Sequence, residues 1–280
     1  MDLWQVVVLS IIQGLTEFLP VSSSGHLILG SKLIGLPSPG LTFAIWVHVG
    51  TAFATVVMLR KNISWLIKGI FRPTSKQERK RCLILAGYII AASIPAAIVG
   101  ILFEDHIDSY FSSSLVASIC LIVTGCILQF SKSTPSVKPT SAATNLSTQD
   151  FPLDTVTFPK SLIVGVSQAI AIIPGISRSG TTITAGLLTG MSREDSAVFS
   201  FLLSLPAVFG AAFLDIMQAV KTQKPVFEPM ALLGGTISFG VGMIALAVLF
   251  RTIRKGELYK FSHYCWIVGI LAVIASLALG

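Results

Sequence analysis

Charged residues are scarce in this sequence. Of its 280 residues only 12% are charged and 53% are hydrophobic, and the mean hydropathy is +0.81. Soluble domains carry about 25% charged residues, so this composition excludes an ordinary soluble domain. Most of the net charge of +7 lies in loops beside hydrophobic segments, which is not the pattern of a nucleic-acid-binding surface. We therefore predict an integral membrane protein that binds no nucleic acid.

Cysteines are also few, and their spacing excludes two common uses. The four of them show neither a C-x-x-C pair nor an extracellular disulfide framework, and all lie in or beside apolar segments (Cys82, Cys120, Cys126 and Cys265). We interpret them as small buried hydrophobic residues. The N-terminus lacks a basic region and a small-residue cleavage site, so we expect no removable signal peptide.

Long apolar runs dominate the chain. A bilayer-spanning helix needs about 20 apolar residues, and six segments approach or reach that length: 41–59, 82–103, 114–130, 197–218, 230–250 and 262–280. Two further apolar regions, 2–36 and 161–191, are interrupted by polar, Gly and Pro residues. Non-helical backbone at membrane depth is tolerated where it is buried in protein or lines a cavity. We predict an all-α membrane protein with six transmembrane helices and two re-entrant helix–loop–helix hairpins.

The two interrupted regions carry one polar motif twice. The first copy reads Gln13-Gly-Leu-Thr-Glu17-Phe-Leu-Pro-Val-Ser22-Ser23-Ser24-Gly25-His26, and the second reads Gln168-Ala-Ile-Ala-Ile-Ile-Pro-Gly-Ile-Ser177-Arg178-Ser179-Gly180-Thr181. Aligned without gaps, Gln13 falls on Gln168 and Ser22 on Ser177. Two copies of one scaffold therefore carry different chemical groups. Paired interrupted segments at matching places in two halves predict a membrane binding site where the halves meet.

Each hairpin is followed by three predicted spans, which gives two repeats, 1–130 and 161–280. An odd number of crossings per repeat predicts an inverted topology. The connecting linker, 131–160, is rich in Ser, Thr and Pro and is expected to be flexible and cytoplasmic. Basic residues crowd loops 60–81 and 251–260, which predicts that both loops are cytoplasmic. Both termini are then expected outside the inner (plasma) membrane.

The first hairpin gathers groups that are costly inside a membrane. Gln13 and Glu17 lie four residues apart and share one helix face. An intramembrane acid is unfavourable unless it faces a partner or a wet cavity. Ser22, Ser23 and His26 follow, so the cluster offers a metal ligand or base, a nucleophile and a proton carrier. Alternatively, these groups hydrogen-bond the freed backbone of a broken helix.

The second hairpin offers an anion cradle. Arg178 is a permanent cation whose fork of donors matches phosphate oxygens. The half-helix that follows presents free N–H groups and the positive end of its dipole. Ser177, Ser179 and Thr182 add hydroxyl donors. The alternative is that Arg178 is the structural partner of Glu17, and the two roles are compatible.

Other polar positions are weaker candidates. His48 lies inside a predicted span, and we interpret it as a core histidine rather than a functional one. Arg193, Glu194 and Asp195 are interpreted as a charge cluster at the start of a helix. None of these positions enters the predicted site.

The two motifs closely resemble those of the undecaprenyl-pyrophosphate phosphatase family, also known as the bacitracin-resistance proteins. Gln13-Gly-Leu-Thr-Glu17 fits that family's Glu/Gln-x-x-x-Glu motif, and Pro174-Gly-Ile-Ser-Arg-Ser179 fits its Pro-Gly-x-Ser-Arg-Ser motif. The resemblance covers nearly the whole chain, including its length, span count and duplication. Because Gln13 cannot be an anionic ligand or a general base, more of those duties fall on Glu17.

The resemblance implies hydrolysis of undecaprenyl (C55 isoprenyl) pyrophosphate to the monophosphate, which recycles the lipid carrier of cell-wall synthesis and confers bacitracin resistance. It also implies a divalent cation, Mg²⁺ or Ca²⁺, and a site that opens to the outer face, and it leaves a homodimer open. Glu17 would be a metal ligand or base, with Gln13 as a weak ligand. Ser23 would be the leading nucleophile, His26 a nucleophile or proton carrier, and Arg178 the phosphate clamp. The phosphates would be supported by hydroxyls, those of Ser22, Ser177, Ser179 and Thr182.

Inverted repeats with broken helices are also typical of secondary transporters. A transporter or flippase would use the Ser/Arg cradle to hold an anionic lipid or a small anion. Glu17 together with His26 favours the phosphatase, because a pure anion carrier needs neither a nucleophile nor a base. Within the phosphatase reading, Ser23, His26 and an activated water are all candidate nucleophiles.

Overall fold

The computed structural model describes residues 1–36, 40–102, 113–134, 153–223 and 226–279. Within these ranges every regular element is helical and no strand occurs. The elements follow in the order α1 (Leu3–Thr16), α2 (Ser23–Leu33), α3 (Leu41–Met58), α4 (Arg60–Phe71), α5 (Lys76–Leu102), α7 (Ser114–Gln129), η1 (Phe130–Ser133), α8 (Phe158–Ile170), α9 (Arg178–Leu188), α10 (Arg193–Lys221), α11 (Pro229–Lys255), η2 (Leu258–Lys260) and α12 (Phe261–Leu279). The all-α prediction is confirmed for the part of the chain that the structure describes.

Long apolar helices make this a multi-pass membrane protein. By length and composition, five helical stretches of the described chain can cross a membrane: Lys76–Leu102, Ser114–Ser133, Arg193–Lys221, Pro229–Lys255 and Leu258–Ala278. Helices α3 and α4 pass the same test together, with a bend of 72° between them. Multiple crossings are therefore confirmed, whereas the count of six stays a prediction.

Both interrupted regions fold as helix–turn–helix pairs, α1 with α2 and α8 with α9. In each pair a serine caps the second helix at the same point of the motif. Ser22 Oγ accepts a hydrogen bond from the Gly25 N–H at 3.3 Å, and Ser177 Oγ accepts one from the Gly180 N–H at 3.1 Å. The breaks predicted from the Pro, Gly and Ser residues therefore lie where the helices end.

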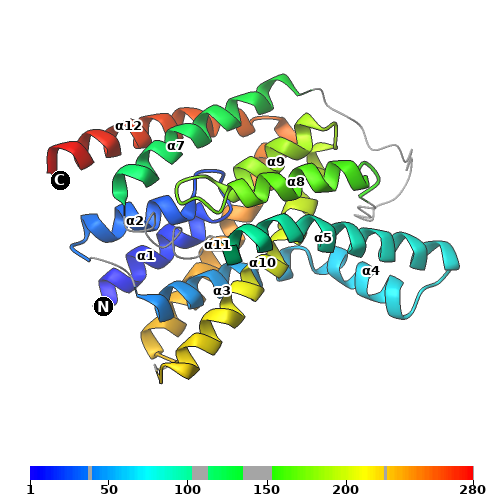
Figure 1. The fold of residues 1–280 in the computed structure, drawn as a ribbon, viewed down its shortest axis with the longest axis horizontal. Coiled ribbons are helices and arrows are strands. Elements are labelled where there is room, and N and C mark those ends of the chain that lie inside the picture. The colour runs from blue at the N-terminus through cyan, green and yellow to red at the C-terminus, as the bar shows by residue number, and fades with distance from the viewer. Residues whose placement is uncertain (37–39, 103–112, 135–152, 224–225, 280) are drawn as a thin grey trace.

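Helices from the two halves of the sequence pack closely against each other. Figure 1 shows α7 and α12 side by side, and α1 packs on α11 while α5 packs on α8. The closest approach of α3 to α11 depends on a pair of glycines, because a Cβ on Gly50 would lie 2.1 Å from the carbonyl oxygen of Gly235. Small residues let helices in a membrane approach and gain van der Waals contact. A substitution that adds a side chain at Gly50 would push these helices apart.

A buried aromatic residue anchors the break of the first hairpin. Phe18 directly follows Glu17 and is 1% exposed. Its ring meets that of Phe201 edge to face, with centroids 5.8 Å apart, and a Cβ on Gly242 would lie 2.6 Å from it. Edge-to-face pairs of this kind are favourable. The packing of Phe18 therefore fixes the direction of the adjacent carboxylate.

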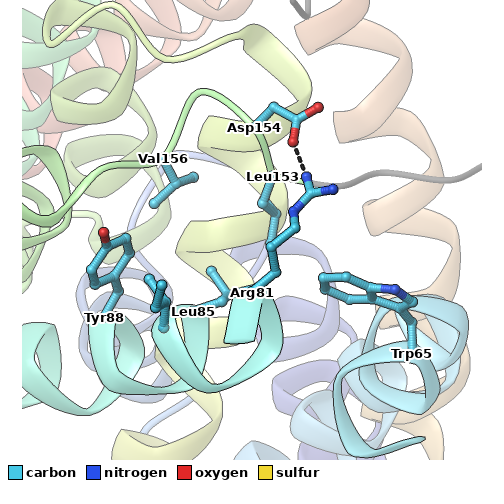
Figure 2. Close-up of a pocket in the computed structure, with 8 residues that line it drawn as sticks. Trp65, Arg81, Leu85, Tyr88, Leu153, Asp154 and Val156 are labelled. Carbon is cyan, nitrogen blue, oxygen red and sulfur yellow. Dashed lines mark hydrogen bonds and ion pairs between the residues drawn. The ribbon is translucent and has the colours of Figure 1, made fainter. Parts of the chain in front are cut away.

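The end of the predicted linker is packed against the helices. Leu153 and Val156 are buried, and Figure 2 shows them around a cavity of about 150 Å³ beside Tyr88 of α5. Arg81 and Asp154 form an ion pair at its rim. Residues 135–152 of the linker lie outside the described part of the chain, so the prediction of flexibility is not tested there.

Asp195 lies in the first turn of α10, as predicted for the charge cluster at a helix start, and it also contacts the linker. It is 4% exposed and accepts hydrogen bonds from the N–H and the hydroxyl of Thr155. Ser192, at the N-cap of α10, donates its N–H to Thr155 Oγ1 at 2.9 Å. Asp195 thus ties the last residues of the linker to α10. The sequence pattern missed this contact because it joins positions far apart in the chain.

Candidate functional site

The turns of the two hairpins meet, and an ion pair joins them. The guanidinium of Arg178, at the start of α9, contacts the carboxylate of Glu17, which follows α1. The Gly175 N–H donates to Ser24 Oγ at 3.4 Å, and a Cβ on Gly25 would lie 3.2 Å from Gly175 Cα. The two motifs therefore lie together in space, as the duplication suggested.

Glu17 is the centre of the cluster and is 8% exposed. Its Oε2 accepts hydrogen bonds from Ser23 Oγ at 2.6 Å and from Gln13 Nε2 at 3.1 Å. Its other oxygen accepts from Arg178 Nη2. His48 Nε2 lies 3.8 Å from Oε2. Charge-assisted hydrogen bonds and a neighbouring cation are what a buried carboxylate requires, so the cluster keeps Glu17 ionised and in place.

A residue from α7 holds the second turn in shape. Thr124 Oγ1 donates to the Gly175 carbonyl at 2.9 Å and accepts from the Ser177 N–H at 3.0 Å. Gly175 has φ of +95°, and a Cβ there would lie 2.3 Å from the carbonyl oxygen of Ala117. Glycine is required here both for the backbone angle and for space.

The predicted phosphate-binding serines line both turns. The Oγ atoms of Ser22 and Ser24 are 3.3 Å apart, and those of Ser177 and Ser179 are also 3.3 Å apart. Ser22 has a positive φ of 69°, which is uncommon for a residue with a side chain. Positive φ at such residues costs free energy and concentrates at functional sites. The strain at Ser22 places the following Ser23 next to Glu17.

His26 lies beside this centre rather than within it. Its Nδ1 is 2.8 Å from the Ser22 carbonyl, and its Nε2 is 2.9 Å from the hydroxyl of Tyr264 on α12. A carbonyl only accepts, so Nδ1 carries the proton and a neutral imidazole accepts the Tyr264 hydroxyl at Nε2. The rings of His26 and Tyr264 are stacked, with centroids 5.7 Å apart. None of the hydrogen bonds of His26 reaches Glu17 or Ser23.

Arg178 keeps a donor for an additional ligand. Its Nη1 is buried and has no hydrogen-bond partner among the described residues. The same is true of Thr181 Oγ1, one turn further along α9. By contrast, the Thr182 hydroxyl donates to the Arg178 carbonyl at 2.7 Å and lies 2.6 Å from Ser200 Oγ of α10. Thr182 therefore steadies the helix that carries Arg178, and its predicted contact with phosphate stays a prediction.

The oxygen donors near Glu17 suit a cation that shares its ligands with a phosphate. Gln13 Oε1 is buried without a partner among the described residues, beside the carboxylate. No group of three or more His, Cys, Asp or Glu side chains that could hold a metal occurs in the described ranges. Mg²⁺ commonly binds through one or two carboxylates together with substrate phosphates. Glu17 and Gln13 fit that arrangement.

Three residues that contact the site were not assigned to it from the sequence, and all lie on helices beyond the two hairpins. His48 of α3 faces Glu17, which is not the core position we expected for it. Thr124 of α7 contacts the second turn, and Tyr264 of α12 contacts His26. The presence of histidine inside an apolar span was the one available signal, since such residues tend to be functional. Thr124 and Tyr264 carried no comparable signal.

Apolar helices around a buried acid–guanidinium centre define a membrane protein with an internal polar site. The chain belongs to the family described as bacitracin resistance protein BacA, whose model it matches over residues 6–271. It is 40% identical to the undecaprenyl-diphosphatase of Desulforapulum autotrophicum, over 98% of this chain and 99% of the relative. It is 39% identical to the undecaprenyl-diphosphatase of Halothermothrix orenii, over 98% of each chain, and 36% identical to that of Parabacteroides distasonis, over 99% of each.

Proposed function

We propose that this protein cleaves undecaprenyl pyrophosphate into undecaprenyl phosphate and inorganic phosphate. One observation carries the proposal: the carboxylate of Glu17, the hydroxyl of Ser23 and the guanidinium of Arg178 converge from two separate hairpins. The names of full-length relatives point to the same reaction. Hydrolysis would return the lipid carrier of cell-wall synthesis for reuse, which accounts for a role in bacitracin resistance.

The contacts of Ser23 support it as the nucleophile. Glu17 Oε2 accepts the proton of the Ser23 hydroxyl. Ser23 Oγ then attacks the terminal phosphorus of the lipid. The bond from this phosphorus to the bridging oxygen breaks, and undecaprenyl phosphate leaves with the proton. Water then cleaves the phosphoserine, which releases inorganic phosphate and restores the hydroxyl. An anion carrier has no use for a serine that donates to a buried carboxylate.

Arg178 is proposed as the clamp for the phosphates. Phosphoryl transfer depends mainly on positioning and on neutralising charge. The unpartnered Nη1 of Arg178 provides a donor for this task, and Ser177, Ser179 and Ser22 lie in the same pair of turns. His26, held by Tyr264, would carry a proton at the edge of the site.

A divalent cation, Mg²⁺ or Ca²⁺, is proposed to bind with the substrate. Glu17 and Gln13 would contribute oxygen ligands, and phosphate oxygens would complete the set. When bound, the cation would neutralise charge on the phosphates. Gln13 is the weaker of the two ligands because its amide is uncharged.

An inverted repeat is proposed for the two halves, with each hairpin entering the bilayer without crossing it. The matched serine caps support it, and so does the exchange of partners in which α1 packs on α11 and its counterpart α8 packs on α5. Both termini lie at the same end of the molecule in Figure 1. With the basic loops in the cytoplasm, both termini and the opening of the site would face outward. A homodimer is compatible with this arrangement.

Phosphate release from a lipid pyrophosphate tests the proposed function. Purified protein in detergent with Mg²⁺ or Ca²⁺ should release inorganic phosphate from a long-chain isoprenyl pyrophosphate. A chelator should stop the reaction, and added cation should restore it, because Arg178 alone cannot neutralise the negative charge of a diphosphate. A protein that binds the lipid but releases no phosphate would be a transporter or flippase. Turnover that survives chelation would contradict the proposed cation.

The nucleophile can be identified by two substitutions. Ser23→Ala should abolish turnover, because Ser23 Oγ is the atom that donates to Glu17. His26→Ala should lower turnover less, and added imidazole should restore part of the loss. Phosphate release is measured for both variants under saturating lipid. Full activity in Ser23→Ala would instead favour His26 or an activated water.

A further inference from the structure

A groove of about 1000 Å³ lies where α3 bends into α4 and where α10 begins and α11 ends. None of its lining residues belongs to either hairpin motif, and its walls differ in character. Five basic residues and two acids line one part: Arg60, Lys61, Arg251, Arg254, Lys255, Glu194 and Glu257. Apolar side chains line the rest, among them Val198, Ile244, Val248 and Phe250.

One face of α11 combines both characters along its length. Ile244, Val248, Arg251 and Lys255 recur at helical spacing and so lie on the same side of the helix. Ile244 is 65% exposed and Val248 is 48% exposed, although both are apolar. In a membrane protein such residues face lipid. These four residues form a stripe along α11 that runs from a lipid-facing apolar surface to the basic end of the helix.

Each acid of the groove already has a basic partner, one from the groove itself and one beside it. Glu194 accepts from Arg254 Nε at 2.9 Å, and Glu257 accepts from Lys260 Nζ at 2.7 Å. Arg251 and Lys255 form no salt bridge with any described residue, and the Arg60 guanidinium donates to the Val57 carbonyl at 3.0 Å. Glu257 also attracts Lys255, but the five cations of the groove outnumber its two acids, so the groove keeps an excess of positive charge.

We propose that this groove binds an anionic phospholipid of the surrounding leaflet. The headgroup phosphate would lie between Arg251, Lys255 and Arg60, and an acyl chain would follow Val248 and Ile244 into the bilayer. Basic pockets between helices at the membrane interface are suited to anionic headgroups. A soluble anion would satisfy the cations but would leave the exposed apolar stripe unused, so the lipid is the occupant that matches both walls.

Native mass spectrometry of the purified, detergent-solubilised protein tests this site directly. Dissociation constants are measured for phosphatidylglycerol, phosphatidylcholine and glycerol phosphate, which has the anionic group without the chains. The wild type should prefer phosphatidylglycerol over both other probes. The double variant Arg251→Gln/Lys255→Gln should bind phosphatidylglycerol about tenfold or more weakly, since each cation near an anionic surface contributes roughly fivefold.

A matched variant controls for the loss of two positive charges. Arg79→Gln/Lys80→Gln removes two exposed cations of α5 that lie outside the groove, and it should bind phosphatidylglycerol as the wild type does. Phosphate release from solubilised lipid pyrophosphate shows whether each variant is folded. Equal weakening in both double variants would mean attraction by net charge alone and would overturn the site. Equal affinity for glycerol phosphate and phosphatidylglycerol would overturn the lipid as its occupant.

Discussion

Glu17→Gln should lower phosphate release by about 100- to 10,000-fold, the range typical of losing a general base. The amide keeps the size of the side chain and can still accept from Ser23 and Arg178, but it cannot take the serine proton. The loss should appear mainly in kcat, because the residue acts on the reacting hydroxyl. Initial rates of phosphate release across a range of lipid concentrations measure this.

The control for Glu17→Gln is a glutamate outside the site. Glu78 lies in the first turn of α5, away from the site, and accepts hydrogen bonds from Thr74, so Glu78→Gln should leave turnover unchanged. Thermal unfolding of both variants separates a loss of chemistry from a loss of folding. Near-normal turnover in Glu17→Gln would show that Glu17 is not the general base, even though it accepts a hydrogen bond from Ser23.

Hydropathy located most of the helices because apolar runs and Pro, Gly and Ser breaks are local features. The predicted span 114–130 coincides closely with α7, Ser114–Gln129. The predicted span 82–103 begins six residues late, because the first turns of α5, from Lys76, are helical but charged. Hydropathy detects only the apolar part of a helix, which lies in the bilayer, so it does not detect charged helical turns that extend into water.

The centre of the site could be predicted because its groups lie in two recognisable motifs. Glu17 and Arg178 were expected to meet, and they do. His48, Thr124 and Tyr264 were not assigned to it, because each is a single residue on a helix that reaches the site only through packing. A residue that acts through such long-range contacts leaves no spacing pattern in the sequence.

Arg178→Ala should also lower phosphate release, by about a thousandfold, since a cation that stabilises a phosphoryl-transfer transition state contributes on this scale. Arg178→Lys should recover only part of the loss, because the donors of lysine share one nitrogen and cannot reproduce the fixed spacing of Nη1 and Nη2. Free guanidinium added to Arg178→Ala should restore some turnover. The same addition should not change Arg72→Ala, which lacks an exposed arginine outside the site.

The alternative is that Arg178 only neutralises the buried Glu17. Removing one partner of a buried ion pair costs about 3–5 kcal/mol, whereas replacing both partners is far less costly. The double variant Glu17→Gln/Arg178→Gln should therefore unfold at a higher temperature than Arg178→Gln alone. If Arg178 also clamps phosphate, the double variant will be folded but will bind the lipid pyrophosphate weakly. Wild-type affinity in the double variant would show that the guanidinium holds the acid and not the substrate.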